Sequence, residues 1–248
     1  MARSFVADLC QFLMRDQAAA SGYPFTMACW FCSVNDEIWQ TLMCLGNSAA
    51  GTNYAQLEIR GDLGEPLIKC LRLIVRDSGG YVYADTTTGY SANIWHHACG
   101  ICVSSTERHV FLDGGSKGSN TQSKNFPSGI NRTGIGARVP GASPSAFFDG
   151  RIAEAAIWEA ALSESEVAVL ARNFCPLFVR PQSLIAYWRL FNPDAGVNPE
   201  MMGGLYLSDY NSPGMGDHPR IIYPGFPTTL VRAAGGISPL LLRAIEKY

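Results

Sequence analysis

Apolar and polar residues alternate with a period of two in several stretches of the chain, which is the pattern of β-strands that bury one face. Residues 54–60 and 69–76 show it most clearly, because every second residue is aliphatic and most positions between are polar or aromatic. Residues 25–33 are largely apolar throughout, which predicts a central strand covered on both faces. Similar patterns predict further strands over residues 10–14, 39–45, 81–84, 94–104, 107–112 and 152–158.

Turn and cap signals separate these strands and add one helix. Residues 94–104 and 107–112 are expected to pair as a hairpin, and the sequence Asp-Gly-Gly at 113–115, which follows them, can supply the positive φ angles of a further hairpin turn. Residues 116–131 and 138–145 are rich in small and polar residues and are expected to be loops. Ser163 and Glu166 have the spacing of a capping box, which predicts a short helix that begins after Ser163.

The strand and the helix between residues 147 and 166 follow one another closely. If residues 152–158 form a regular strand, Ile152, Glu154, Ala156 and Trp158 share one side of it. The run F-x-G-x-I-x-E-x-x-I-W-x-x-A-L-S-x-x-E that ends at Glu166 resembles the last strands and the helix of the LamG-like, concanavalin A-like jelly-roll family.

Other segments carry the same resemblance. They are P-F-T-M-A-C-W-F at 24–31, W-H-H-A at 95–98, V-F-L-D-G-G at 110–115 and T-G-I-G-A at 133–137. The resemblance extends from about residue 5 to about residue 191, where residues 186–190 would be the closing strand with Trp188 as an anchor. It implies an all-β fold, a two-sheet antiparallel jelly-roll sandwich with one short helix.

The last part of the chain differs in composition from the rest. We therefore expect two parts, a jelly-roll domain over residues 1–191 and an extended C-terminal arm over 192–248 that holds seven of the 14 prolines. Residues 220–224 are expected to form an extended arm or edge strand, and 238–245 a terminal helix that begins with Ser-Pro. The arm residues expected to bury against the sandwich or another subunit are Ile221, Ile222, Tyr223, Leu240, Leu241 and Ile245.

Composition excludes several classes of function. The formal net charge is −2 and only 16% of residues are charged, which argues against a nucleic-acid partner. No run of about 18 apolar residues exists, which argues against a membrane span. Charges at Arg3 and Asp8 interrupt the N-terminus too early for a secretory signal, so we expect synthesis in a cytoplasm, with the eight cysteines mostly reduced and packed in strands.

The motifs for metal and catalytic chemistry are weak. Cys29 and Cys32 have the spacing of zinc ligands, but residues three apart on a strand face opposite sides. The same argument makes the adjacent His96 and His97 poor partners for one metal. No triplet of carboxylates has the E-x-D-x-x-E spacing that the glycosidases of this superfamily typically use. We therefore expect no enzyme and no cofactor.

Calcium stays open, because relatives bind it at loop edges with Asp and Asn oxygens. Asp85, Asp113 and Asp149 are available, but each lies in a turn where Asp commonly serves the backbone, and no site is assigned.

Two functions fit this description. The first is a structural or assembly protein, a virion surface component such as a phage capsid decoration protein, in which the arm contacts capsid or identical subunits. The second is a lectin-like module for surface glycans, because Trp39, Tyr81, Tyr83 and Tyr90 are candidates for an aromatic platform on which sugar rings stack.

Overall fold

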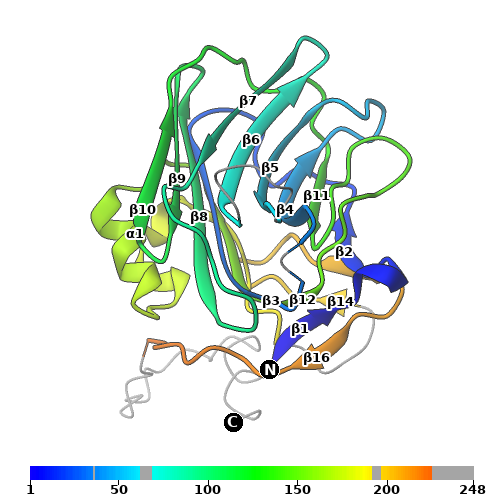
Figure 1. The fold of residues 1–248 in the computed structure, drawn as a ribbon, viewed down its shortest axis with the longest axis vertical. Helices are drawn as coiled ribbons and strands as arrows, with labels where there is room; N and C mark the ends of the chain where they lie inside the picture. Colours follow the sequence, from blue (N-terminus) through cyan, green and yellow to red (C-terminus); the bar gives the residue numbers. More distant parts are fainter. Residues whose placement is uncertain (36, 62–68, 192–196, 225–248) are drawn as a thin grey trace, which may run out of the picture.

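The computed structural model describes residues 1–35, 37–61, 69–191 and 197–224. Within them the chain forms two antiparallel β-sheets that pack face to face, with one α-helix on the outside (Figure 1). The all-β sandwich expected from the sequence is confirmed.

The first sheet, here called sheet A, contains the central strand predicted over 25–33. Its order is β10-β9-β8-β3-β12-β1-β16, and β13 also pairs with β12. The strands are β1 Ala2–Phe5, β3 Phe25–Ser33, β8 His96–Ser104, β9 Glu107–Leu112, β10 Gly115–Asn120, β12 Gly150–Trp158, β13 Leu184–Trp188 and β16 Gly214–Gly216.

The second sheet, sheet B, contains the two strands with the clearest alternation. Its order is β14-β15-β2-β11-β4-β5-β6-β7. The strands are β2 Phe12–Arg15, β4 Gln40–Gly46, β5 Tyr54–Ile59, β6 Leu71–Asp77, β7 Gly80–Asp85, β11 Arg132–Ile135, β14 Val197–Asn198 and β15 Leu207–Tyr210. The helix α1 spans Glu164–Ala171, and 3-10 turns span Ala7–Leu9 (η1), Pro176–Phe178 (η2) and Pro181–Ser183 (η3).

The core lies between the two sheets. Leu57 of β5, Leu73 of β6 and Phe31 of β3 belong to one continuous cluster of buried side chains, as the period-two pattern predicts. Trp188 of the closing strand is fully buried in the same cluster, as expected. The predicted capping box is also present, because the Ser163 hydroxyl accepts from the Glu166 N–H while the Glu166 carboxylate accepts from the Ser163 N–H.

A β-bulge at Glu154 corrects the side assignment in β12. Ile152 faces the core, whereas Trp158 lies in the outer cluster that α1 covers, so these two residues do not share a side. Glu154 has a φ of 53°, and the register with β3 shifts between Ala153 and Ala156. A bulge inserts one unpaired residue and reverses the alternation beyond it.

Several short strands lie outside the predicted ranges. β1 precedes the first expected strand, and β10 occupies part of the 116–131 segment that was expected to be a loop. β10 contains only Gly, Ser, Lys and Asn, so it has no apolar alternation that could predict it. It is an edge strand, and its backbone pairing with β9 holds it in place. The turn between them has φ of 53° at Asp113 and 74° at Gly114, as a hairpin turn requires.

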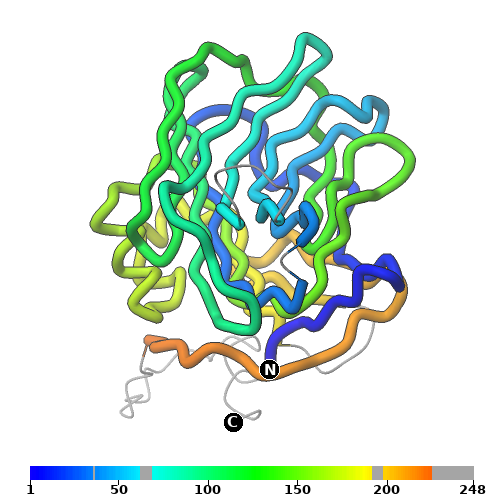
Figure 2. Tube along the Cα trace, viewed as in Figure 1, coloured from blue at the N-terminus to red at the C-terminus, as the bar shows by residue number. Residues whose placement is uncertain are grey.

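The described part of the arm packs onto the sandwich of its own chain. The residues after the predicted boundary at 191 therefore continue the sandwich and do not form a separate unit. β15 pairs with β2, and β16 pairs with β1. Arg3 of β1 and Asp209 of β15 form a buried, bidentate ion pair at 2.6 and 2.7 Å, so the tail joins the two sheets. Figure 2 shows the C-terminal segment passing beside the N-terminus along one end of the molecule.

Residues 217–224 then cover part of the outer face of sheet A. Ile221 packs against the cluster that contains Trp30, and the Tyr223 hydroxyl donates to the Glu154 carboxylate at 2.7 Å. The backbone of Ile222 pairs with the segment around Phe174. Of the six arm residues singled out in the sequence, Ile221 and Tyr223 dock in cis through their side chains and Ile222 through its backbone alone, since its side chain is exposed, and Leu240, Leu241 and Ile245 lie outside the described residues.

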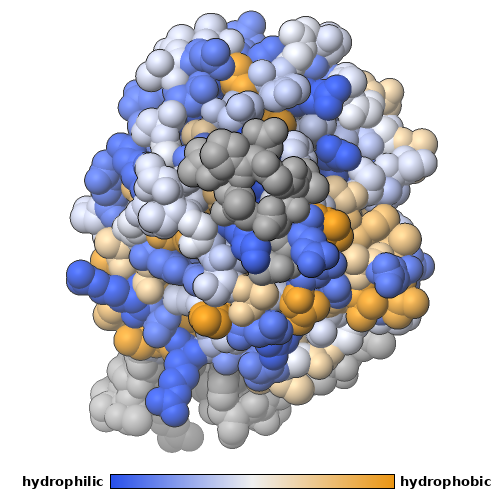
Figure 3. Space-filling model, in the orientation of Figure 1, coloured by the Kyte–Doolittle hydropathy of each residue, from blue (hydrophilic) through white to orange (hydrophobic). Residues whose placement is uncertain are grey.

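The surface seen in Figure 3 is mixed in polarity, and apolar atoms gather at its lower right, over the η1 turn. Val6 and Leu9 of this segment are exposed. None of the helices in the described ranges has the length and apolar character that a membrane span requires.

Candidate functional site

The outer face of sheet B, the face turned away from sheet A, carries three cross-strand rows of side chains on β5, β6 and β7. The first row is Tyr54, Arg76 and Tyr81, the second is Gln56, Ile74 and Tyr83, and the third is Glu58, Arg72 and Asp85. The residues between them on each strand point into the core, so the rows follow directly from the period-two pattern of these strands.

Three of the four aromatic residues singled out in the sequence meet on this face. The rings of Tyr81 and Tyr83 stack with centroids 6.0 Å apart and are 53% and 39% exposed. The Arg72 guanidinium lies 3.6 Å from the centroid of Tyr83 and 5.4 Å from that of Trp39, which precedes β4. Arg72 therefore joins Trp39 to the tyrosine pair, and the three rings form one surface, here called the aromatic surface.

Ion pairs fix the arginine at the centre of the aromatic surface. Asp85 accepts from Arg72 Nε at 2.6 Å and from Nη2 at 2.7 Å, and it also lies 3.6 Å from Arg60. Arg60 in turn lies 5.1 Å from the Trp39 ring. A bidentate pair holds the guanidinium plane in one orientation, so the rings that it contacts are held as well.

Tyr90, the fourth candidate, does not belong to this surface. It is 4% exposed and lies in the core between the sheets, where its ring packs against Phe31 and His96. A sugar ring has no access to it there.

The half of the outer face over β4 and β5 is closed rather than exposed. Residues 136–149 cross it, and Ala137, Val139 and Phe147 pack onto Tyr54 and its apolar neighbours. Gly46 permits this close approach, because a Cβ there would lie 2.9 Å from the Pro140 nitrogen. The outward-facing residues of β5 are therefore buried, which the sequence pattern alone did not indicate.

Buried polar groups lie on this covered floor. The Gln56 amide donates to the Glu58 carboxyl group, and Glu58 is 3% exposed. Burial raises the pKa of Glu58 to about 7, against the opposing pull of the positive charges on Arg72 and Arg138. This carboxyl group is therefore about half protonated near neutral pH.

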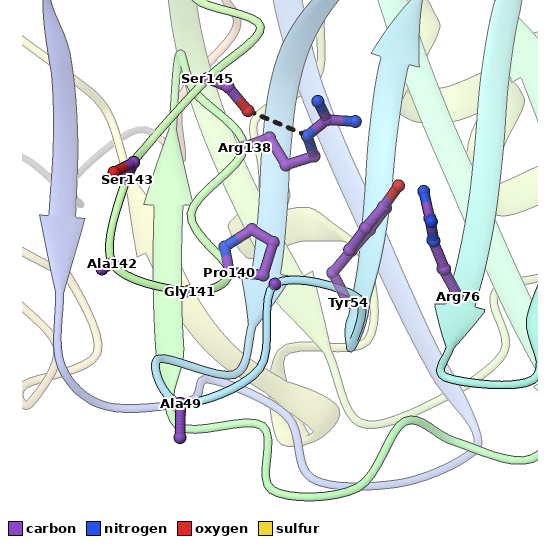
Figure 4. A pocket seen from close by; sticks show the side chains of 10 residues that line it. Ala49, Tyr54, Arg76, Arg138, Pro140, Gly141, Ala142, Ser143 and Ser145 are labelled. Atoms are coloured by element: carbon purple, nitrogen blue, oxygen red, sulfur yellow. Dashed lines mark hydrogen bonds between the residues drawn. The ribbon is translucent and has the colours of Figure 1, made fainter.

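A pocket of about 500 Å³ opens between the covering loop and the edge of the aromatic surface (Figure 4). Tyr54 lies between two arginines, Arg76 from β6 and Arg138 from the loop, in this view. Arg76 lies 6.0 Å from the rings of both Tyr54 and Tyr81, so it links the pocket to the aromatic surface. The remaining lining residues are Ala49, Gly51, Pro140, Gly141, Ala142, Ser143 and Ser145.

The other candidate residues do not come together. Asp85 pairs with arginines, Asp113 accepts from the His97 N–H and lies 2.6 Å from His96, and the backbone N–H of Asp149 donates to Gln40 Oε1 at 2.7 Å. Within the ranges that the structure describes, no group of three His, Cys, Asp or Glu side chains is arranged to hold a metal.

The two pairs expected to face opposite ways do so. Cys29 faces the core, while Cys32 contacts Arg151 on the outer side. His97 packs on Trp30, whereas His96 lies beside Phe31.

Comparison with known protein families shows which family this chain belongs to. The sequence profile described as the concanavalin A-like lectin/glucanases superfamily, Laminin_G_3, matches residues 12–168, more than half of the chain. The chain belongs to this family. The match begins at β2 and ends within α1, so it includes the strands that carry the aromatic surface and the loop that lines the pocket. No curated protein sequence matches the chain.

Solved structures with the same fold include sugar-binding modules. The CBM40 of the Ruminococcus gnavus IT-sialidase, bound to α2,3-sialyllactose, aligns with a TM-score of 0.54 at 12% identity over 61% of this chain and 84% of that one. A Bacteroides ovatus protein described as carbohydrate binding aligns with a TM-score of 0.58 at 17% identity, over 84% of this chain and 57% of that one. At these identities the likeness shows the fold alone.

Proposed function

We propose that this protein is a non-catalytic carbohydrate-binding protein that holds a glycan across the aromatic surface of sheet B, with sugar rings on Trp39, Tyr81 and Tyr83. The observation that carries the proposal is the exposure of three aromatic rings on one face, in contact with arginines that ion pairs hold in place. Aromatic faces are electron-rich and apolar, so they suit the C–H groups of a pyranose ring. An exposed aromatic group beside a pocket is also the usual form of a binding site.

Sugar binding in similar sandwiches supports the proposal. The Ruminococcus gnavus module holds a sialylated sugar on the same fold. Since that likeness extends only to the fold, the position of the glycan on this chain rests on its own residues.

The arrangement of carboxylates favours binding over hydrolysis. Glycosidases place two carboxyl groups on either side of the scissile bond. The ten residues that line the pocket include no Asp or Glu, and Asp85 of the aromatic surface is held by two arginines. We propose that the protein binds its glycan without cleaving it.

The assembly reading loses part of its support, because residues 197–224 stay on their own chain while Leu240, Leu241 and Ile245 lie outside the described residues. It required the arm to reach a neighbouring subunit, but the described residues 197–224 complete the protein's own sheets and dock on its own outer face. No described residue favours a phage capsid decoration protein. Protein-subunit partners and a place in a virion stay predictions.

A glycan array with four proteins tests the proposal. The native protein should bind a subset of glycans, and Trp39→Ala and Tyr81→Ala should each weaken that binding roughly tenfold, which corresponds to about 1.4 kcal/mol. Phe178→Ala is the matched control, because Phe178 is an exposed aromatic residue 45% accessible on η2, in contact with Phe174 rather than sheet B. An array without any binding, or equal losses for all three variants, would contradict the proposal.

A further inference from the structure

The pocket at the edge of the aromatic surface is positively charged, and the stacking of sugar rings on Trp39, Tyr81 and Tyr83 does not require this charge. Arg76 and Arg138 lie on either side of Tyr54, with guanidinium carbons 6.0 and 5.7 Å from its ring centroid (Figure 4). The two cations come from separate elements, one from the end of β6 and the other from the covering loop. They face a pocket of about 500 Å³, large enough for a sugar residue.

As far as the structure describes the chain, neither Arg76 nor Arg138 has a carboxylate partner of the kind that balances the charge of Arg72 and Arg60 on the same face. Arg72 and Arg60 share the carboxylate of Asp85, whereas among the described residues no ion pair involves Arg76 or Arg138. Arg138 Nε donates to the Ser145 hydroxyl at 3.1 Å, which orients its guanidinium with a neutral partner. Arg76 Nε is buried and has no hydrogen-bond partner within the described part of the chain.

Because the Nε of Arg76 has no access to solvent, a ligand in the pocket would bind the terminal N–H groups of the guanidinium instead. The buried Glu58 interacts electrostatically with Arg138, but at neutral pH this carboxyl group is only partly ionised and so offsets only part of the positive charge. The lining is free of acidic residues and includes Ser143 and Ser145, whose hydroxyls can bind sugar hydroxyls.

We propose that this pocket binds an anionic sugar residue, one that carries a carboxylate or a sulfate, with its acidic group on the guanidinium of one of the two arginines while the other, across the Tyr54 ring, adds to the positive potential. The planar guanidinium fork matches both oxyanions and forms charge-assisted hydrogen bonds with them. The adjoining Tyr81 then stacks on the next sugar, since the Arg76 guanidinium lies 6.0 Å from the ring centroids of both Tyr54 and Tyr81. This inference rests on the proposed function and specifies the class of glycan.

The loop that supplies Arg138 is held in a form that suits the pocket. The backbones of Arg138 and Ser145 pair with each other in both directions, at 2.8 and 3.0 Å. Arg132 Nη1 donates to the Gly141 carbonyl at 2.7 Å, so the tip of the loop is also fixed. The second arginine therefore stands ready beside Tyr54, and binding needs little ordering of the loop.

The test compares sialylated, uronate-containing and sulfated glycans with their matched neutral forms on one array, followed by titration calorimetry of the best binder. The native protein should bind at least one anionic class more than tenfold better than its neutral counterpart, and raising the salt concentration should weaken that binding. Arg76→Gln and Arg138→Gln should each reduce the affinity for the anionic glycan roughly tenfold, and should weaken the binding of the neutral one by a clearly smaller factor.

Arg172→Gln is the matched control, because it removes one exposed positive charge at the end of α1, on the sheet A side. Selective binding of carboxylated or of sulfated glycans identifies which oxyanion the pocket takes. If neutral and anionic forms bind equally and the pocket variants match Arg172→Gln, the inference is overturned while the proposed function stands. If no glycan of either kind binds, the proposed function fails and the inference fails with it.

Discussion

The buried carboxyl group of Glu58 predicts an unusual dependence of stability on pH, which Glu58→Gln should remove. Burial raises the pKa of Glu58 to about 7 in the folded protein. In the unfolded chain this carboxyl group titrates near 4.5, so between these values the folded state binds one more proton than the unfolded state. The free energy of unfolding therefore falls as the pH rises from 4.5 to 7.

The size of the effect follows from the separation of the two pKa values. Each unit is worth about 1.4 kcal/mol, so full ionisation of Glu58 costs the folded state roughly 3 kcal/mol at pH 8. Glutamine keeps the shape of the protonated acid and can still accept the hydrogen bond that the Gln56 amide donates. Glu58→Gln should therefore equal the native protein in stability at pH 4.5 and exceed it by up to about 3 kcal/mol at pH 8.

Urea unfolding of both proteins at pH 5, 6, 7 and 8 measures this difference. Because the two proteins are compared at each pH, the contributions of all other titrating groups cancel. Glu159→Gln makes the same substitution at an exposed position and is the matched control. A Glu58→Gln variant whose difference from the native protein is the same at pH 5 and pH 8 would refute the reasoning.

Three further changes test the packing. Burial lowers the pKa of His97 to about 4, so the stability that the neutral imidazole contributes is lost as the pH falls from 6.5 toward 4. His97→Gln should therefore remove about 3 kcal/mol of this acid dependence, as measured by urea unfolding. Asp209→Ala leaves Arg3 buried without its carboxylate and should cost about 3–5 kcal/mol in thermal or urea unfolding; a loss below 1 kcal/mol would show that the tail is not part of the sandwich. Ile221→Ala removes the contact with the Trp30 cluster and should speed hydrogen exchange at the Cys175 amide, whereas unchanged exchange would contradict cis docking.

Periodic patterns predicted the strands that bury one face, because in those strands the burial of every second, apolar side chain stabilises the sheet. They did not predict β10, which is rich in Gly and Ser, or β16, which is Gly-Met-Gly, because both strands are held mainly by backbone hydrogen bonds. The reversal of sides in β12 depends on one backbone conformation at Glu154, and a regular period carries no sign of it. Leu205 and Leu207 reach the core from a tail segment without visible periodicity, and Tyr210 of β15 stacks on Phe12 of β2.

The site was predicted in part. Tyr81 and Tyr83 were identifiable because two tyrosines alternate on a short strand, so they share a face. Tyr90 was not distinguishable from them in the sequence, since its burial depends on the packing of a loop over Phe31. The roles of Arg76 and Arg138 depend on the register of β5, β6 and β7 and on the path of the loop, and neither is readable from spacing along the chain.

The central claim is that a glycan lies on the outer face of sheet B. The most direct measurement is a crystal structure of the full chain with the best-binding glycan from the array. We expect a sugar ring within contact distance of Tyr81 and Tyr83, with the adjoining residue in the pocket beside Tyr54. A glycan bound at full occupancy on sheet A, with the aromatic surface left in solvent, would contradict the account.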